Sequence, residues 1–330
     1  MAADYSELAD MIAVAIGARR SEVSARRARV RALLVDLDDD PMIAAAVSGR
    51  HVPGTPYEYS HGWVRTGMRP PGDADRAELK SRGIKIPSGW TDVQVSVDPH
   101  ADLQVIGKDS KGRSQYVYSA EHSARQSAAK FARIRMMRDK MPAIDGALAR
   151  DARTEDAAAA LLLIRRMGLR PGSDSDTGAE KKAYGATNLL AGQVSVSGDV
   201  VRFRFTGKKG VELDLEIDDP DVAKVIEPRL SGKAPGERLF VTNEKKTAGY
   251  LKRIDPSVKL KDLRTYRGTD IAGQLVAGTD APVNRKTYKA AVNNVALMVS
   301  QALGNTPSVA LESYIDPSVF SPWRFAADIR

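Results

Sequence analysis

The chain has no cysteine among its 330 residues, and it has only four histidines. Without cysteine it can form no disulfide, no thiolate metal site and no cysteine nucleophile. The histidines lie at positions 51, 61, 100 and 122, and no pair has the spacing of zinc ligands. The sequence therefore predicts no bound metal ion, and the lack of thiols fits a reducing cytoplasm.

Long apolar segments are missing as well. No run reaches the roughly 18 residues that a membrane-spanning helix needs. The N-terminal stretch MAADYSELADMIAVAIG carries acidic side chains where a secretory signal peptide would carry basic ones. We therefore expect a soluble, cytoplasmic protein that makes no contact with a membrane.

Nucleotide-binding and serine-hydrolase signatures are also absent. The segment GKDSKGRS, residues 107–114, resembles a P-loop, but Arg113 stands where the lysine belongs. A P-loop must also open a helix, whereas the following QYVYS alternates like a strand. Neither GxGxxG nor GxSxG occurs in the chain. We therefore expect no nucleotide cofactor.

Positive charge is what the chain has in excess. The formal net charge is +8 and the pI is near 9.5. A surplus of this size favours a polyanionic partner, although nucleic-acid, ribosomal and membrane-surface proteins all share it.

Three regions differ in their patterns. Residues 1–50 have helical spacing and include the arginine-rich run RRSEVSARRARVR, which is typical of a solvated helix face and compatible with a DNA contact. Residues 51–120 contain helix-breaking prolines and the alternating segments WTDVQVSVD and DLQVIG, which predict a small, mainly antiparallel β domain. Residues 121–330 predict a larger, mostly α-helical domain. The expected fold class is α+β.

The third region also contains the pattern of a short three-stranded sheet. The segments GQVSVS, DVVRFRF and VELDLEI alternate and are separated by turns. In the middle strand Val201, Phe203 and Phe205 should point to one face, and Arg202 and Arg204 to the other. The preceding segment EDAAAALLLIRRMG predicts an alanine- and leucine-rich helix that ends at Gly168.

Residues 107–118 predict a β-turn that presents cations, an amide and aromatic rings together. These side chains suit phosphate contact and readout of base edges. An ordinary basic hairpin is the alternative on this segment alone. The side chains concerned are Lys108, Lys111, Arg113, Gln115, Tyr116 and Tyr118.

Further basic side chains stand at predicted turns. Arg170 follows Gly168 in GLRPG, and Lys208 lies at the tip of the TGKKG turn, where a lysine often serves solubility only. Arg264, in KDLRTYRGT, is expected to be partly buried beside Leu263, where an arginine needs an anionic partner.

A short helix is predicted close to the C-terminal end. The helix NNVALMVSQALGN should stop at Gly304, and Thr306 and Pro307 are typical of the cap and first position of the next helix. Tyr314 falls late in that helix, just before Asp316. Taken alone, a tyrosine in such a place is usually part of the core.

Taken together, these residues resemble a known catalytic pentad. Their order matches the one that type IB DNA topoisomerases share with tyrosine recombinases: Arg170, Lys208, Lys261-x-x-Arg264, Asn305 and Tyr314. The surrounding motifs are similar to the compact poxvirus and bacterial type IB enzymes over roughly residues 50–320. These motifs are KIPSGWTDV, GKDSKGRSQYVY, GLRPG, YGATNLL, FTGKKG, KDLRTYRGT and LGNTPSVALESY.

The chain departs from that family in three places. Many members have histidine where this chain has Asn305, although bacterial-type members resemble it in having asparagine. A basic residue or histidine is commoner directly after the tyrosine than Ile315. Residues 1–50 resemble no family that we can name.

The resemblance implies a specific chemistry. Tyr314 would attack a DNA phosphate and form a 3′-phosphotyrosyl bond, while Arg264 and Asn305 hold the non-bridging oxygens. Lys208 would protonate the leaving 5′-oxygen, with Arg170 assisting. A phenol has a pKa near 10, so nearby positive charge must help it to lose its proton. The family needs neither ATP nor a metal ion.

The resemblance also implies a monomer that clamps double-stranded DNA and is therefore associated with the nucleoid. The DNA-binding residues that it suggests are Lys108, Lys111, Arg113, Gln115, Tyr116, Tyr118, Tyr184 and Lys261. Two alternatives stay open: a tyrosine site-specific recombinase or integrase, which uses the same pentad, and a DNA-binding protein that kept the fold without the activity.

Overall fold

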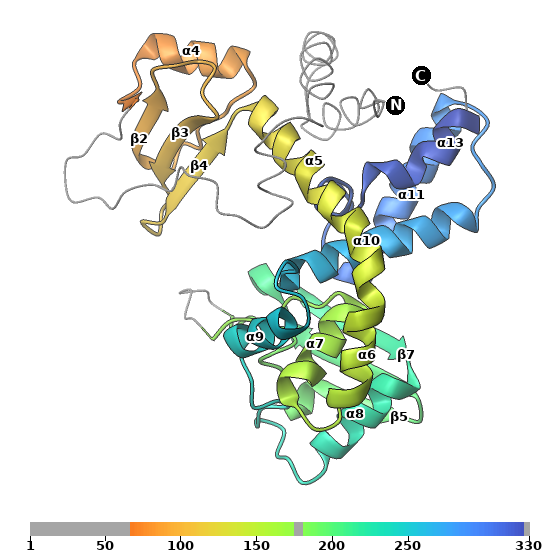
Figure 1. Ribbon diagram of the computed structural model, residues 1–330. Helices are drawn as coiled ribbons and strands as arrows, with labels where there is room; N and C mark the ends of the chain where they lie inside the picture. The colour runs from red at the N-terminus through yellow and green to blue at the C-terminus, as the bar shows by residue number, and fades with distance from the viewer. Residues whose placement is uncertain (1–66, 175–180, 327–330) are drawn as a thin grey trace. The chain divides into compact units, whose positions relative to one another are not determined.

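The computed structural model describes residues 67–174 and 181–326 (Figure 1). The chain divides into two compact units, residues 1–131 and residues 132–330. The predicted N-terminal helices and their arginine-rich run lie outside the described residues. The predicted α+β fold class is confirmed.

The first unit contains a four-stranded antiparallel sheet with the strand order β1-β2-β3-β4. Leu79 packs with Val95 and Val105 in a small core, which places helix α4 on one face of the sheet (Figure 1). The elements are β1 (Met68–Arg69), α4 (Asp73–Ser81), β2 (Thr91–Ser96), β3 (Leu103–Lys108) and β4 (Ser114–Tyr118).

Helix α4 was not expected, because the sequence pattern treated Pro70 and Pro71 as breakers of regular structure. These prolines instead precede the helix, where proline is tolerated. The backbone N–H of Gly72 donates to the carboxylate of Asp75 at 2.7 Å, and this bond caps the first turn.

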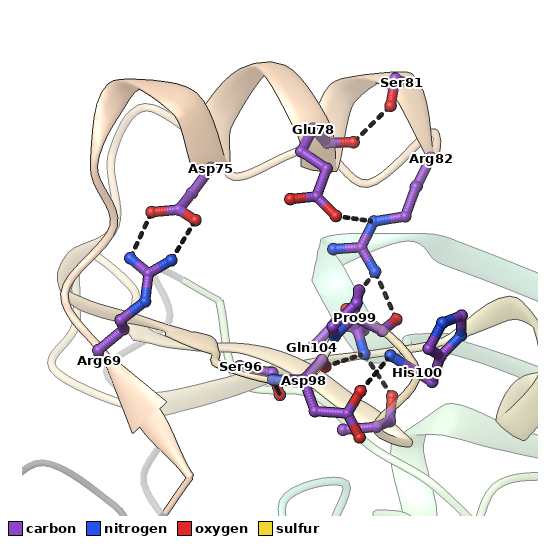
Figure 2. A network of polar contacts seen from close by, with 11 residues as sticks. Arg69, Asp75, Glu78, Ser81, Arg82, Ser96, Asp98, Pro99, His100 and Gln104 are labelled. Carbon is purple, nitrogen blue, oxygen red and sulfur yellow. Dashed lines mark hydrogen bonds and ion pairs between the residues drawn. The ribbon is translucent and has the colours of Figure 1, made fainter.

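A polar network ties α4 to the sheet (Figure 2). Arg69 forms an ion pair with Asp75 at 2.6 Å. Directly after the helix, Arg82 donates to the carbonyl of Pro99 at 2.6 Å and to the side-chain oxygen of Gln104 at 2.7 Å. Because Gln104 belongs to β3 and is buried, these bonds brace the strand that leads into the β3–β4 hairpin.

The second unit is mostly helical, and α5 (Ala120–Met136) runs across the division between the units. The later α-helices are α6 (Met141–Asp151), α7 (Asp156–Met167), α8 (Pro220–Leu230), α9 (Glu244–Ile254), α10 (Leu260–Ala277), α11 (Arg285–Leu303), α12 (Pro307–Ser313) and α13 (Ser321–Ala326). The 3₁₀ segments are η2 (Met137–Lys140), η3 (Ala191–Gln193), η4 (Lys208–Gly210) and η5 (Pro317–Phe320). None of the helices described is long and apolar enough to cross a membrane.

The predicted three-stranded sheet is present as β5 (Val194–Ser197), β6 (Val200–Thr206) and β7 (Glu212–Asp218), paired antiparallel in that order. Val201, Phe203 and Phe205 share one face, as the alternation predicted, and they are buried. Helix α7 is buried on nearly all sides, from Ala157 to Ile164, which explains its alanine- and leucine-rich sequence. This helix and the sheet form the core on which the second unit is built.

Candidate active site

The turn after α7 brings Arg170 into position. The helix ends at Gly168, as predicted, in the left-handed conformation with φ of 68°. That conformation favours glycine, and a Cβ at Gly168 would lie 2.5 Å from Cδ2 of Leu303, which would have to move. The carbonyl of Arg170 accepts from the backbone N–H of Ala186 at 2.8 Å. The backbone that carries Arg170 is therefore fixed.

Arg264, in α10, is only 4% exposed. Its guanidinium donates to the carbonyl of Gly168 and, at 2.5 Å, to that of Leu303. These carbonyls lie at the C-terminal ends of α7 and α11, where helix dipoles place partial negative charge. The sequence led us to expect an anionic partner, but backbone carbonyls hold this arginine instead.

The charge of Arg264 is consequently not neutralised by a carboxylate within the described parts of the chain. Burial lowers the pKa of Arg264, and the nearby charge of Arg170 lowers it further. An arginine stays protonated in spite of such shifts. The site therefore holds a buried positive charge that a phosphate could compensate.

Tyr314 ends helix α12 and lies against both arginines. The guanidinium carbon of Arg264 is 4.8 Å from the centroid of its ring, which is a cation–π contact. The Nη1 of Arg170 donates to the phenol oxygen at 3.4 Å, a long hydrogen bond. Burial tends to raise the pKa of Tyr314, but the charges and hydrogen bonds of Arg264 and Arg170 outweigh burial, and the pKa lies below its ordinary value.

Asn305 lies between α11 and α12, directly after Gly304. The predicted stop at Gly304 is present with φ of 60°, and Thr306 and Pro307 begin α12 as expected. The side-chain oxygen and nitrogen of Asn305 are shielded from solvent and have no hydrogen-bond partner among the described residues. Because a buried amide without partners is costly, this side chain is well suited to bind a polar ligand.

Lys208 does not join this group. It is exposed in η4, between β6 and β7, and no bond links it to the other four residues. The base of this hairpin is nevertheless anchored beside the site, because a Cβ at Gly304 would lie 2.5 Å from Cδ2 of Leu213 in β7. The structure thus brings Arg170, Arg264 and Tyr314 into contact and leaves Lys208 at a hairpin tip near the end of α11.

Two other residues from the expected DNA-binding set belong to the second unit. Lys261 is exposed at the start of α10, one turn before Arg264. Tyr184 is half-buried against the core, and the Nζ of Lys182 lies 5.6 Å from the centroid of its ring. The backbone N–H of Tyr184 donates to the carbonyl of Thr206 at 2.8 Å, which fixes Tyr184 beside the strand that leads to Lys208.

In the β3–β4 hairpin of the first unit, acidic side chains hold several of the expected contacts. Lys108 forms an ion pair with Asp92 at 2.8 Å, and Arg113 forms one with Asp109 at 2.7 Å. Asp109 also accepts from the Gln115 amide at 3.0 Å and from the backbone N–H of Lys111 at 2.9 Å. The hydrogen bond from Arg113 is the main reason that the pKa of Asp109 is lowered to about 2.

The hairpin presents two faces. Tyr116 and Tyr118 are exposed on one face, whereas Gln115 alternates to the other. The ring of Tyr118 stacks on His122, with 4.7 Å between the centroids. Cations and aromatic rings are thus available here, but the cations share their charge with carboxylates.

Most described arginines of the second unit have carboxylate partners; several exposed ones do not, but the two that contact Tyr314 also lack one. Arg170 and Arg264 have none among the described residues, and neither does Lys208. The arginines that do are Arg133, Arg135, Arg165, Arg166, Arg202, Arg204, Arg229, Arg238, Arg253 and Arg267. The described residues contain no group of three or more acidic or histidine side chains that could hold a metal ion. Arg170 and Arg264, whose charges no described carboxylate balances, can bind an anion beside Tyr314.

Sequence reasoning missed the residues that hold the backbone of Tyr314. In α10, Thr269 donates to the backbone carbonyl of Tyr314, and Gly268 packs against the same residue. Thr269 also accepts from the backbone N–H of Asp316, in the segment after α12. The motif KDLRTYRGT includes Gly268 and Thr269, but nothing local indicates that they meet a residue so distant in the chain.

Comparisons with known proteins agree with this geometry. The family described as eukaryotic DNA topoisomerase I, catalytic core, matches residues 119–317, a range that includes Arg170, Lys208, Arg264, Asn305 and Tyr314. DNA topoisomerase 1B of Acanthamoeba polyphaga mimivirus is 27% identical over 256 residues, which cover 70% of this chain and 75% of the viral protein.

Two further relatives are slightly less similar to this chain. DNA topoisomerase 1B of vaccinia virus (strain Copenhagen) is 23% identical over 271 residues, 76% of this chain and 83% of the viral protein. DNA topoisomerase 1 of Daucus carota is 26% identical over 174 residues, 49% of this chain but only 22% of the plant protein.

Proposed function

Because the chain belongs to the DNA topoisomerase I family, whose catalytic core matches residues 119–317, we propose that it relaxes supercoiled duplex DNA by cutting and resealing one strand. It is a type I DNA topoisomerase, and its viral relatives assign it to type IB, of the poxvirus-like kind. The roles of the individual residues in that reaction are our proposal.

The observation that carries the proposal is the contact of Tyr314 with two arginines that have no carboxylate partner among the described residues. The Nη1 of Arg170 lies 3.4 Å from the phenol oxygen, and Arg264 lies over the ring. A DNA phosphate resists attack because its anionic oxygens repel nucleophiles. Fixed cations reduce that repulsion and stabilise the charge that develops in the transition state. The same cations favour the phenolate of Tyr314.

The reaction exchanges one phosphate ester for another. The oxygen of Tyr314 loses its proton to water and bonds to phosphorus, while the bond from phosphorus to the 5′-oxygen breaks and that oxygen gains a proton. Arg264 and Asn305 bind the non-bridging oxygens, Lys208 donates the proton and Arg170 assists the transfer. A tyrosyl ester is about as energetic as the bond that it replaces, so resealing needs no ATP.

Lys208 reaches the leaving oxygen only once DNA is bound. Its position in the short η4 segment between two strands leaves the side chain exposed, so it is free to reach a bound duplex. Metal ions are not required by this scheme, because the fixed cations supply the electrostatic stabilisation that a divalent ion supplies in other enzymes.

DNA binding involves both units of a single chain in this proposal. The β3–β4 hairpin, Lys261 and Tyr184 contact the duplex, mainly through phosphates. Affinity should therefore fall steeply as salt rises, because each phosphate contact releases condensed counterions.

A plasmid assay tests the proposal. The purified chain is incubated with supercoiled plasmid in EDTA without ATP, and samples are quenched with detergent. We expect relaxed topoisomers and a covalent protein–DNA adduct. Tyr314→Phe should abolish both while the affinity for duplex DNA changes little, since one hydroxyl is removed.

The alternatives give different results in the same assay. A site-specific recombinase would leave a plasmid without paired recognition sites unrelaxed. A DNA-binding protein without activity would bind the plasmid but form no adduct. Either outcome for the wild-type chain would overturn the proposal.

A further inference from the structure

The backbone of the nucleophile is held by one side chain of α10. On the basis of the proposed function, we propose that Thr269 is a positioning residue that fixes Tyr314 for attack, and that the ion pair between Asp316 and Arg135 supports it. Neither Thr269 nor this ion pair belongs to the catalytic group around Tyr314.

The Thr269 hydroxyl bridges two backbone groups on either side of Ile315. It donates to the carbonyl of Tyr314 at 3.1 Å and accepts from the backbone N–H of Asp316 at 3.0 Å. Helix α12 ends at this point, so these two groups lack regular helical partners. One hydroxyl therefore satisfies both and fixes the direction in which the chain leaves the helix.

The packing beside this bridge leaves little room for displacement. A Cβ at Gly268 would lie 2.8 Å from the carbonyl oxygen of Tyr314 and 3.0 Å from its Cβ, so the nucleophile rests directly on the α10 backbone. Ile315, the next residue, is fully buried. Helix α10 thus carries Arg264, which lies over the phenol, and also Gly268 and Thr269, which hold the same residue from behind.

Asp316 anchors the far side of the bridge. Its carboxylate is 2% exposed, accepts from the backbone N–H of Ser318 at 3.0 Å and pairs with Arg135 of α5 at 2.8 Å. An unpaired buried carboxylate is costly and would repel a phosphate held nearby. Arg135 neutralises this charge, so Asp316 can hold the chain without opposing the substrate.

Accurate placement matters here because the hydrogen bond from Arg170 to the phenol, at 3.4 Å, is already near the limit of useful distance. A displacement of about 1 Å at a reacting group can cost about 100-fold in rate. A phenol that moves away from Arg170 and Arg264 also loses the charges that lower its pKa. Loss of the bridge should therefore slow cleavage and move its pH dependence toward alkaline values.

Substitution at Thr269 tests this inference. Thr269→Val keeps the shape but removes the bridging hydroxyl, whereas Thr269→Ser retains it. Thr247→Val is the matched control, because it removes a buried hydroxyl that is hydrogen-bonded to Thr242 in a region without contacts to Tyr314. The measurements are the single-turnover rate of adduct formation on supercoiled plasmid from pH 6 to 10, and the affinity for the same DNA.

We expect Thr269→Val to form the adduct about 10- to 100-fold more slowly at neutral pH, with an alkaline shift of the profile and unchanged DNA affinity. Thr269→Ser should stay within about threefold of wild type, and Thr247→Val should show no pH shift. A Thr269→Val enzyme with the wild-type rate and pH profile would overturn the inference. So would equal slowing in Thr269→Val and Thr247→Val.

The ion pair provides a second test that does not depend on Thr269. Arg135→Ala leaves a buried carboxylate unpaired and should slow adduct formation, whereas the double variant Arg135→Ala/Asp316→Asn should recover much of the rate. A double variant as slow as Arg135→Ala would show that the ion pair does not help to position Tyr314. If the wild-type chain itself forms no adduct, the proposed function fails. If the wild type forms the adduct and the variants match its rate and pH profile, only the positioning role fails.

Discussion

The Tyr314 site of the second unit, which comprises Tyr314, Arg170, Arg264 and Asn305, and the β3–β4 hairpin of the first unit are both cationic, but they balance their charge in different ways. In the hairpin, Lys108 and Arg113 pair with Asp92 and Asp109 and remain exposed. In the Tyr314 site, Arg264 is buried and donates to backbone carbonyls instead of to a carboxylate.

This difference agrees with the task of each region in the proposed function. Exposed ion pairs contribute little, because water and salt screen them, so a phosphate can replace the carboxylate at little cost. A buried carboxylate in the Tyr314 site would compete with the scissile phosphate for the arginines, at a low dielectric where charges interact strongly. Acidic partners are therefore tolerable where DNA is held and harmful where it is cut.

The largest expected effect comes from adding a carboxylate to the Tyr314 site. Asn305→Asp keeps the size of the side chain but adds a negative charge, and we expect adduct formation to fall at least about 100-fold, the cost of losing one stabilising donor. Asn305→His is the matched control, because many type IB topoisomerases have histidine at this position. The Asn305→His variant should remain active. An Asn305→Asp enzyme that cleaves at the wild-type rate would break the comparison.

The second effect concerns the pH dependence of cleavage. Because Arg264 and Arg170 hold the pKa of Tyr314 below its ordinary value, the phenolate fraction should rise with pH, and the midpoint of that rise should lie below the ordinary value near 10. Arg170→Ala removes one of the two charges, so the rising limb should move to higher pH and the loss of rate should shrink as pH rises. The rate of adduct formation from pH 6 to 10 measures this, and a parallel loss at every pH would contradict it.

Several features that position the residues of the Tyr314 site were predictable because their causes are local. Gly168 and Gly304 stop helices, Thr306 caps one, and Phe203 alternates inward in a strand, each through its own backbone or nearest neighbours. Helix α4 was missed because a pair of prolines can either break a helix or precede one, and the residues after the pair decide between these outcomes.

The partners of the catalytic side chains were not predictable, because they come from distant parts of the chain. Arg264 donates to Gly168, 96 residues away, and to Leu303, 39 residues away. Thr269 meets Tyr314 across 45 residues. Residue types and order indicated the catalytic group through its resemblance to a family, but only tertiary packing decides that carbonyls, and no carboxylate of the described chain, hold the buried arginine.

A smaller effect is expected at the hairpin cations. Arg113→Gln removes one proposed phosphate contact, so DNA affinity should fall a few-fold and the slope of affinity against salt should decrease by about one. The rate of cleavage by bound enzyme should be unchanged, unlike the result for Asn305→Asp. Binding isotherms at several salt concentrations measure the slope, and an unchanged slope would remove Arg113 from the DNA contacts.

The smallest expected effect has the opposite sign. Asp109→Asn keeps an acceptor for the turn but releases Arg113 from its carboxylate, so DNA affinity should rise about twofold to fivefold at low salt. The low pKa of Asp109, about 2, means that the wild-type carboxylate stays ionised throughout the usual assay range, so the gain should not vary between pH 5 and 9. Weaker binding in Asp109→Asn would show instead that Asp109 is needed to shape the hairpin, and the acids of the hairpin would then be structural rather than exchangeable partners of its cations.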